Sequence, residues 1–510
     1  MAQDPSPVDF NQHVKTDTLR SDLKRRSLQS GLITVSAQPL KFGLGIGSTA
    51  VLARLLTPAD FGLIAMMAPL LALVDSVTNL GLETATVQRE QLDHQQASAI
   101  FWLSLKINAV VIGFMVLMAP VLAWFYREAE LTKITLVMAV GVLGVCLSFQ
   151  HQSLLKRQMR FGALTAIEIG ALIGGTVSAI AAAWLGFGYW ALVFQVVVMQ
   201  LIQSISYWVV CGWRPAKYVK SSKPDSNLRA MLSYGAHLSG FRCLTRVATK
   251  LDRILIGYLS GAGALGLYSV AYKWAYFSFE QIYYPLFDVA VSSFSRALHD
   301  PDMYRAYCRR GLMPIYAFCM PALAFSFIAA RDLILLLLGN QWLEAVGIFR
   351  VLVIGVFVGS IYRVTKWLYV SAGQTQRQLR WAFIHTPVLS IAVAVGALWG
   401  VYGVAMGYTV ANGLLAFPAI AFCLKTSPLS LRDFLGVVSR PAFSSLGAAV
   451  VLYLCKLGLP SLGSSILALL VSFTIFSIAY LLFWVVLPGG RQATADVIRN
   501  LKELRSQRNQ

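Results

Sequence analysis

Four cationic residues recur along one apolar stretch, residues 240–257, which reads GFRCLTRVATKLDRILIG: Arg242, Arg246, Lys250 and Arg253. In an α-helix with 100° between successive residues, these side chains fall within an arc of about 80° and span ~16 Å along the axis. Such a row attracts anions. Guanidinium groups suit phosphate in particular, because they form bidentate, charge-assisted hydrogen bonds. Asp252 lies outside the arc, so it does not simply neutralise the row.

The stretch is apolar enough to be a membrane span, which makes its charges costly. Each Arg or Lys at the centre of a membrane helix costs about 2.5–3.5 kcal/mol on insertion scales. Four of them facing lipid would cost on the order of 10 kcal/mol, too much for a marginally stable fold. We therefore expect the row to line a wet, cationic cavity. The alternative is local pairing with acids of neighbouring helices, or snorkelling of the side chains to the interface.

Other apolar stretches add cations to this expected cavity. Arg363 and Lys366 are three residues apart and share a helix face. The predicted substrate-binding set is Lys41, Arg242, Arg246, Lys250, Arg253, Lys273, Arg363 and Lys366. Aromatic side chains could stack on sugars, although an interfacial aromatic belt or ordinary packing is the favoured alternative for them: Trp274, Tyr276, Tyr283, Tyr284, Trp367 and Tyr369.

Acidic residues within apolar stretches have a second predicted role. Buried carboxylates can titrate near neutrality, which suits coupling to a proton or sodium gradient. Asp75, Glu280 and Asp288 are the candidates, with a salt bridge as the alternative for each. Seven cysteines occur without CxxC or Cys/His ligand spacing, so we expect neither a disulfide framework, nor a metal site, nor a bound cofactor.

Composition indicates the class of protein. Of 510 residues, 57% are hydrophobic and 13% charged, with a mean hydropathy of +0.64, whereas soluble proteins carry about 25% charged residues. Apolar runs of about 20 residues recur along the chain, so we predict an all-α integral membrane protein. About fourteen spans are expected, at residues 28–53, 61–85, 97–125, 131–150, 163–185, 189–211, 230–257, 264–293, 311–331, 344–371, 380–399, 402–424, 438–457 and 464–487.

The distribution of the 43 Lys and Arg residues predicts the orientation. With the amino terminus in the cytoplasm, most of the cations outside the spans lie on the cytoplasmic side, as the positive-inside rule requires. An even number of spans then places both termini in the cytoplasm. The net charge of +20 is explained by this topology and by the anionic inner leaflet, so nucleic acid is not an expected partner. The outer side holds only Arg54, Arg127, Lys133, Arg331 and Lys456.

Three short matches indicate an internal repeat. FGL at 61–63 matches LGL at 265–267, and QMRF at 158–161 resembles QLRW at 378–381. WLGFGYWA at 184–191 resembles LWGVYGVA at 398–405. Their order and similar offsets favour two six-span halves, with an accidental match of Gly-rich turns as the alternative. The predicted divisions are a cytoplasmic tail (1–27), an N-lobe (28–211), a basic linker (212–229), a C-lobe (230–424), two further spans (425–487) and a basic tail (488–510).

The stretch LARLLTPADFGLIAMMAPLLALVDSVTNLGLETATVQRE, residues 52–90, resembles the Wzx-type polysaccharide flippases of the colanic-acid kind. These belong to the multidrug/oligosaccharidyl-lipid/polysaccharide superfamily. The similarity continues in LDRILIGYLSGAGALGLYSVAYKW, residues 251–274, and in LLLLGNQWLEAVGIFRVL, residues 335–352. It covers most of the chain from about residue 28 to 425.

The resemblance implies a fold and a substrate. It implies fourteen helices, with two six-helix lobes around a central cavity that opens to one side of the inner membrane and then to the other. The expected substrate is an undecaprenyl-diphosphate-linked oligosaccharide used for exopolysaccharide, lipopolysaccharide or O-antigen synthesis. A polysaccharide polymerase and a chain-length regulator are further expected partners. In relatives the second span contributes cationic residues to the cavity, whereas here it carries Asp75 but no cation. Arg54, in LARLL, matches a family motif at the outer end of its helix and is expected, with Asp252, to have a gating or structural role.

Two other functions are alternatives to a flippase. A multidrug antiporter of the same superfamily exports cationic compounds, and a positively charged cavity would repel them. A membrane enzyme acting outside the cell would need catalytic groups on a sizeable outer loop. The outer loops are short, and no nucleophile–base constellation is evident, so we do not expect an enzyme.

Overall fold

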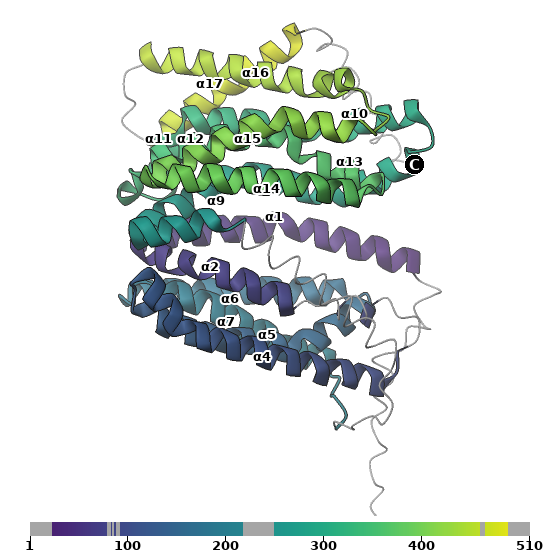
Figure 1. Ribbon diagram of the computed structural model, residues 1–510, viewed down its shortest axis with the longest axis vertical. Helices are drawn as coiled ribbons and strands as arrows, with labels where there is room; N and C mark the ends of the chain where they lie inside the picture. Colours follow the sequence, from purple (N-terminus) through teal and green to yellow (C-terminus); the bar gives the residue numbers. More distant parts are fainter. Residues whose placement is uncertain are drawn as a thin grey trace, which may run out of the picture. The chain divides into compact units, whose positions relative to one another are not determined.

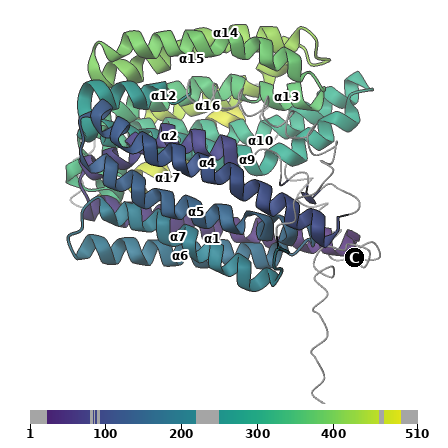
Figure 2. The ribbon, with the colours of Figure 1, turned by 60° about the horizontal axis from the view of Figure 1, so that its bottom comes forward.

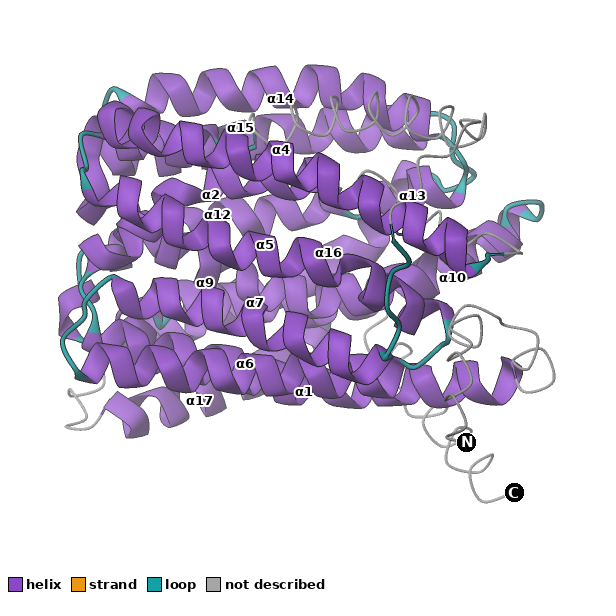
Figure 3. Ribbon diagram, turned by 90° about the horizontal axis from the view of Figure 1, so that it is seen from below, coloured by secondary structure: helices purple, strands orange, loops and turns teal. Residues whose placement is uncertain are grey.

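The computed structural model describes residues 23–78, 83, 86–87, 92–217, 249–458 and 465–487. Within these residues every regular element is a helix and no strand occurs (Figure 3). Twelve of the described helices are long and apolar enough to cross a membrane. An all-α membrane protein is therefore confirmed. Most of the predicted N-terminal tail, most of the basic linker and the C-terminal tail lie outside the described residues.

Two of the fourteen predicted spans are not among those twelve. Helix α1 (Leu23–Leu55) covers the first predicted span, but cations such as Lys41 lower its hydropathy. The seventh, 230–257, lies mostly outside the described residues. Helix α9 (Leu251–Ala297) contains its end and all of the eighth. Gly261, between the predicted spans 230–257 and 264–293, interrupts α9 with φ 78° and ψ −176°, a conformation that glycine adopts readily.

The chain divides into two compact units, residues 1–266 and 267–510. The lobe boundaries expected from the sequence stay a prediction. The helices of the first unit are α1, α2 (Pro58–Thr78), α4 (His94–Tyr126), α5 (Glu130–Arg157), α6 (Phe161–Trp184), α7 (Trp190–Cys211) and the beginning of α9.

Close helix packing in the first unit depends on small residues. Helices α4, α5, α6 and α7 run alongside one another, and α1 packs along α6 (Figure 2). A Cβ atom at Gly175 of α6 would lie 2.7 Å from the Gln195 carbonyl oxygen of α7. Glycine at such a position lets two membrane helices approach backbone to backbone. The α1–α6 contact brings Lys41 of α1 to Glu168 of α6.

The second unit is built on α12, which packs against α10 and α15. Gly355 and Gly359 of α12 are four residues apart and face α15, a small-residue spacing typical of membrane helix interfaces. A Cβ atom at Gly355 would lie 2.6 Å from Thr409 Oγ1. Arg363 follows Gly359 by one turn, so this close approach also places its side chain against α15. The unit's helices are the rest of α9, α10 (Pro301–Ile328), α11 (Ala330–Leu337), η3 (Asn340–Trp342), α12 (Ala345–Arg363), α13 (Thr365–Ser371), α14 (Thr375–Ala397), α15 (Gly400–Leu424), α16 (Leu431–Gly458) and α17 (Ser465–Val486) (Figure 1).

Candidate functional site

Arg363, the last residue of α12, is the centre of a polar cluster in the second unit. Its Nη2 donates to the hydroxyl oxygens of Tyr276 on α9 and Tyr408 on α15, the latter at 2.9 Å. The guanidinium carbon also lies 4.7 Å from the centroid of the Tyr276 ring, which is a cation–π contact. Both tyrosines are buried. Three helices therefore hold this one guanidinium in place.

The positive charge of Arg363 has no carboxylate partner within salt-bridge distance in the described part of the chain. Its hydrogen-bond acceptors are two neutral hydroxyl groups, and its Nε is buried with no hydrogen-bond partner there. Removing an ion from water costs several kcal/mol, and only a counter-ion or a dense set of hydrogen bonds offsets that cost. A guanidinium with neutral acceptors is chemically able to donate charge-assisted hydrogen bonds to an anion.

The helix is interrupted for one residue directly after Arg363. The predicted span 344–371 matches one apolar segment, Ala345–Ser371, within which Val364 separates α12 from α13 and itself keeps a helical conformation (φ −68°, ψ −14°). Side-chain hydroxyls bond the carbonyl oxygens beside the break: Tyr316 to Ile361 at 2.9 Å, Thr365 to Tyr362 at 2.7 Å, and Tyr283 to Arg363 at 3.3 Å. In lipid, backbone carbonyl oxygens that lack a partner within the helix need such hydrogen bonds.

The other predicted cations of the second unit lie on α13 and α9. Lys366 is exposed, and its Nζ lies 5.2 Å from the Phe287 ring centroid. Lys273 and Glu280 are exposed on α9. The Asp288 side chain lies outside the described part of the structure.

In the first unit, Lys41 forms an ion pair with Glu168 of α6. The side chains are 20% and 39% exposed, so water screens the pair only partly. About two turns further along α1, Ser48 accepts a hydrogen bond of 2.7 Å from Gln195 of α7. In this structure Lys41 therefore pairs with an acid of a neighbouring helix, and its role in substrate binding stays a prediction.

Half of the opening cationic row lies outside the described residues, namely Arg242 and Arg246. Lys250 is half-buried in a turn, and α9 starts at Leu251, so one continuous helix does not carry the row through Lys250. Asp252, in the first turn, is buried, and its Oδ1 accepts the Arg253 backbone N–H at 2.8 Å. An acid here complements the unpaired N–H groups and the dipole of a helix start. Apolar periodicity does not mark that start.

The remaining predicted residues of the first unit are solvent-accessible. Asp75 of α2 and Arg54 in the last turn of α1 are both exposed. Among the aromatic candidates for sugar stacking, Tyr276, Tyr283, Trp367 and Tyr369 are buried and pack inside the second unit, whereas Tyr284 is exposed. Their packing is the alternative that the sequence favoured.

Sequence reasoning missed the partners of Arg363. Tyr408 was not singled out, nor were Tyr362, His385 and Asn412, which form a hydrogen-bonded chain behind it. The sequence does show polar residues at a similar depth in the predicted spans 344–371, 380–399 and 402–424. It does not show that these residues contact one another, because that depends on how the helices pack.

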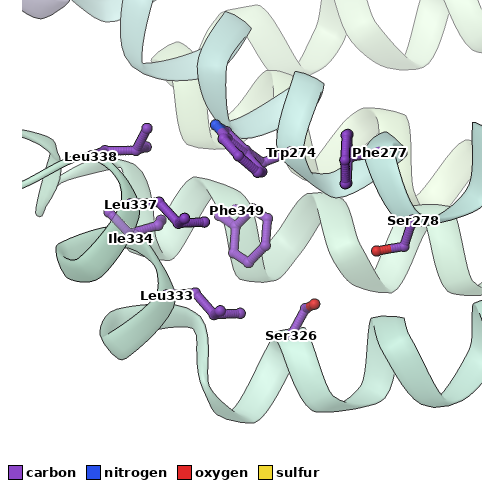
Figure 4. A pocket seen from close by; sticks show the side chains of 9 residues that line it. All are labelled: Trp274, Phe277, Ser278, Ser326, Leu333, Ile334, Leu337, Leu338 and Phe349. Carbon is purple, nitrogen blue, oxygen red and sulfur yellow. The ribbon is translucent and has the colours of Figure 1, made fainter. Parts of the chain in front are cut away.

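An apolar cavity of about 150 Å³ lies elsewhere in the second unit, among α9, α10, α11 and α12 (Figure 4). Trp274, Phe277 and Phe349 contribute rings, and Ser278 and Ser326 are the polar lining residues. No cation lines it, so it does not suit a phosphate group. The leucines of α11 complete its wall.

Comparison with known protein sequences identifies the family. Residues 51–347 match a family model described as "Polysaccharide biosynthesis protein". Lipopolysaccharide biosynthesis protein WzxC of Escherichia coli (strain K12) is 20% identical over 441 residues, which cover 84% of this chain and 88% of WzxC. Teichuronic acid biosynthesis protein TuaB of Bacillus subtilis (strain 168) is 24% identical over 394 residues, covering 74% and 78%. The expected resemblance to Wzx-type proteins is confirmed.

Comparison with solved structures identifies the fold. Lipid II flippase MurJ, in an inward closed conformation, has a TM-score of 0.67 at 15% identity, covering 89% of this chain and 98% of MurJ. An inward-facing multidrug resistance MATE family transporter of the MOP superfamily has a TM-score of 0.60 at 12% identity, covering 78% and 97%. The chain therefore belongs to the polysaccharide biosynthesis protein family, with the fold of the multidrug/oligosaccharidyl-lipid/polysaccharide (MOP) superfamily.

Proposed function

We propose that this protein is a flippase that moves an undecaprenyl-diphosphate-linked oligosaccharide from the cytoplasmic to the periplasmic leaflet. The observation that carries the proposal is Arg363, a guanidinium on a membrane-spanning helix whose acceptors are neutral hydroxyl groups. A diphosphate supplies the negative charge that this site lacks. The names of WzxC and TuaB, which refer to polysaccharide biosynthesis, and that of the lipid II flippase MurJ support a lipid-linked saccharide as the cargo.

Each part of the substrate has its own environment in this proposal. The diphosphate binds Arg363, and the roles expected from the sequence for Arg242 and Arg246 stay predictions. The sugars occupy the water-accessible cavity, and the polyprenyl tail stays in the lipid bilayer. Charge-assisted hydrogen bonds favour the guanidinium–phosphate contact, while keeping the tail in lipid avoids exposing its apolar surface to water.

Alternating access in the inner membrane, with both termini in the cytoplasm, completes the proposed cycle. A cation gradient resets it, with Asp75, Glu280 and Asp288 as the predicted coupling residues. A polysaccharide polymerase and a chain-length regulator would receive the flipped unit. The rival function is efflux of cationic drugs, which a cation-lined path opposes by Coulomb repulsion.

Flipping in proteoliposomes tests the proposal. The probe is a fluorescently labelled undecaprenyl-diphosphate-linked oligosaccharide, and the readout is the fraction that a membrane-impermeant reductant quenches over time. We expect Arg363→Gln to slow flipping by about tenfold or more, since hydrogen bonds to charged groups contribute about 1.5–3 kcal/mol. Arg363→Lys should recover only part of the rate, because it keeps the charge and loses the planar fork.

Arg350→Gln is the matched control, an exposed arginine on the same helix. It should flip the probe at the wild-type rate. Wild-type rates for Arg363→Gln, or efflux of a cationic dye with no flipping of the lipid by the wild type, would refute the proposal.

A further inference from the structure

A histidine within a membrane-spanning helix lies behind the Arg363 site. His385 of α14 places Nε2 2.9 Å from the hydroxyl oxygen of Tyr362 on α12. That hydroxyl lies 2.7 Å from Asn412 Oδ1 on α15. Tyr362 is 7% exposed and Asn412 is 1% exposed, so these groups depend on one another for hydrogen bonds. Ionisable side chains at membrane depth are rare and usually functional.

The hydrogen-bond directions follow from the chemistry of each group. Asn412 Nδ2 donates to the Tyr408 carbonyl oxygen at 2.6 Å, which leaves Asn412 Oδ1 to accept from the Tyr362 hydroxyl. Tyr362 has a single hydroxyl proton, so toward His385 it acts as the acceptor. His385 Nε2 therefore carries the proton in the neutral ring. Its Nδ1 is the atom at which a second proton would bind.

The same helices carry His385's partners and Arg363. Tyr362 and Arg363 are consecutive on α12, and Tyr408 bonds Asn412 through its carbonyl and Arg363 through its hydroxyl. Because Arg363 directly follows the tyrosine that bonds His385, its charge opposes a second positive charge on the histidine ring. An anion on Arg363 would remove that opposition. Proton binding at one residue and anion binding at the other are then linked, each favouring the other to the same degree.

The other titratable groups around α14 do not replace this linkage. On α13, Lys366 lies over the Phe287 ring of α9 and Tyr369 lies beside Cys423. On α14 itself, Arg377 donates to the Phe422 carbonyl oxygen at 2.7 Å. Arg380, the other arginine of α14, is exposed, whereas Arg363 directly follows the tyrosine that bonds His385.

We propose that His385 is a proton-coupling residue of this protein, taking up one proton from solution at Nδ1 when an anion binds Arg363. An N–H bond forms, the imidazole becomes imidazolium, and no other bond changes. The inference rests on the proposed function, because it needs an anion at Arg363. The sequence predicted coupling through the carboxylates of Asp75, Glu280 and Asp288. Coupling through His385 uses a different residue, whose protonated form is a cation.

Calorimetric binding measures the linkage directly. The probe is undecaprenyl-diphosphate N-acetylglucosamine, whose diphosphate is a diester and does not titrate between pH 6 and pH 8. Titrations of the full-length protein in nanodiscs, in buffers of different ionisation enthalpy, give the number of protons taken up per bound lipid. We expect about half to one proton near pH 6.5, and affinity at least about fivefold higher at pH 6 than at pH 8.

Three variants separate the possible causes. His385→Gln should bind at pH 8 as the wild type does, with proton uptake near zero and no pH dependence. Tyr362→Phe, which keeps the ring, should weaken the linkage. His299→Gln changes an exposed histidine outside the site and should behave as the wild type.

The failures are distinguishable. No proton uptake by the wild type on binding, or unchanged uptake by His385→Gln, overturns the coupling proposal while leaving the flippase proposal intact. Loss of binding in Arg363→Gln supports the anion site itself. Undiminished binding by Arg363→Gln, or no binding by the wild type, overturns both proposals.

Discussion

Gly62 of α2 faces the backbone carbonyl of Ala262 in α9, so closely that a Cβ atom at residue 62 would lie 1.7 Å from that oxygen. Gly266 makes the reciprocal approach, since a Cβ atom there would lie 1.7 Å from the Pro58 carbonyl oxygen. Pro58 and Ala262 are separated by 204 residues, as are Gly62 and Gly266. The FGL and LGL matches in the sequence thus bring their two equivalent glycines into reciprocal contact within the first unit.

This contact predicts that neither glycine tolerates a side chain. Gly62→Ala and Gly266→Ala should each destabilise the protein by about 1–3 kcal/mol or more, because the obstructing atoms are backbone and cannot rotate away. The measurement is the midpoint of thermal unfolding in detergent. Gly263→Ala is the control, since a Cβ atom at that residue meets nothing within 4 Å. Equal midpoints for all three variants would contradict the close approach.

The ion pair between Lys41 and Glu168 predicts a rescue by charge exchange. Lys41→Glu and Glu168→Lys should each destabilise the fold by about 1–3 kcal/mol, because each places two like charges at a partly buried contact. The double exchange should restore much of that stability. Flipping by the double variant distinguishes the roles: recovery indicates a structural pair, whereas a stable but inactive protein indicates that Lys41 itself contacts substrate.

The α12–α15 interface predicts coupling between Gly355 and Thr409. Gly355→Ala should lower the free energy of unfolding by about 1–3 kcal/mol, since its Cβ atom would lie 2.6 Å from Thr409 Oγ1. Adding Thr409→Ala removes that hydroxyl and should recover part of the loss, which a double-mutant cycle measures. Gly413→Ala, on α15 with nothing within 4 Å of its Cβ position, is the control. Additive effects of the pair would argue against direct contact.

The hydroxyl groups that hold Arg363 predict a stability cost when one is removed. Tyr408→Phe keeps the ring and deletes one acceptor of the guanidinium, so the free energy of unfolding should fall by about 1.5–3 kcal/mol. Tyr453→Phe changes an exposed tyrosine of α16 and should have an effect below about 0.5 kcal/mol. Denaturation of both variants under the same conditions is the measurement. A neutral Tyr408→Phe would show that its hydroxyl does not support Arg363.

Much of the fold follows from local sequence. A backbone in lipid must satisfy its own hydrogen bonds, so long apolar runs become helices, and the predicted spans match the described helices closely in position. Gly261 interrupts α9 between the predicted spans 230–257 and 264–293. The predicted span 344–371 matches the apolar segment Ala345–Ser371, in which Val364 separates α12 from α13. Tyrosine hydroxyls from α9 and α10 bond carbonyl oxygens beside Val364.

The sequence by itself determined the class of protein, its helices and which residue types carry charge in the membrane, because hydropathy and helical geometry are local properties. The tertiary structure decided which of those charges are compensated. Lys41 meets Glu168 across 127 residues, and Arg363 meets Tyr276 across 87. Such partners are set by how glycine-lined helix faces pack, which no periodicity records. Packing therefore decides that Lys41 has an acidic partner and that Arg363 is bonded to neutral hydroxyl groups.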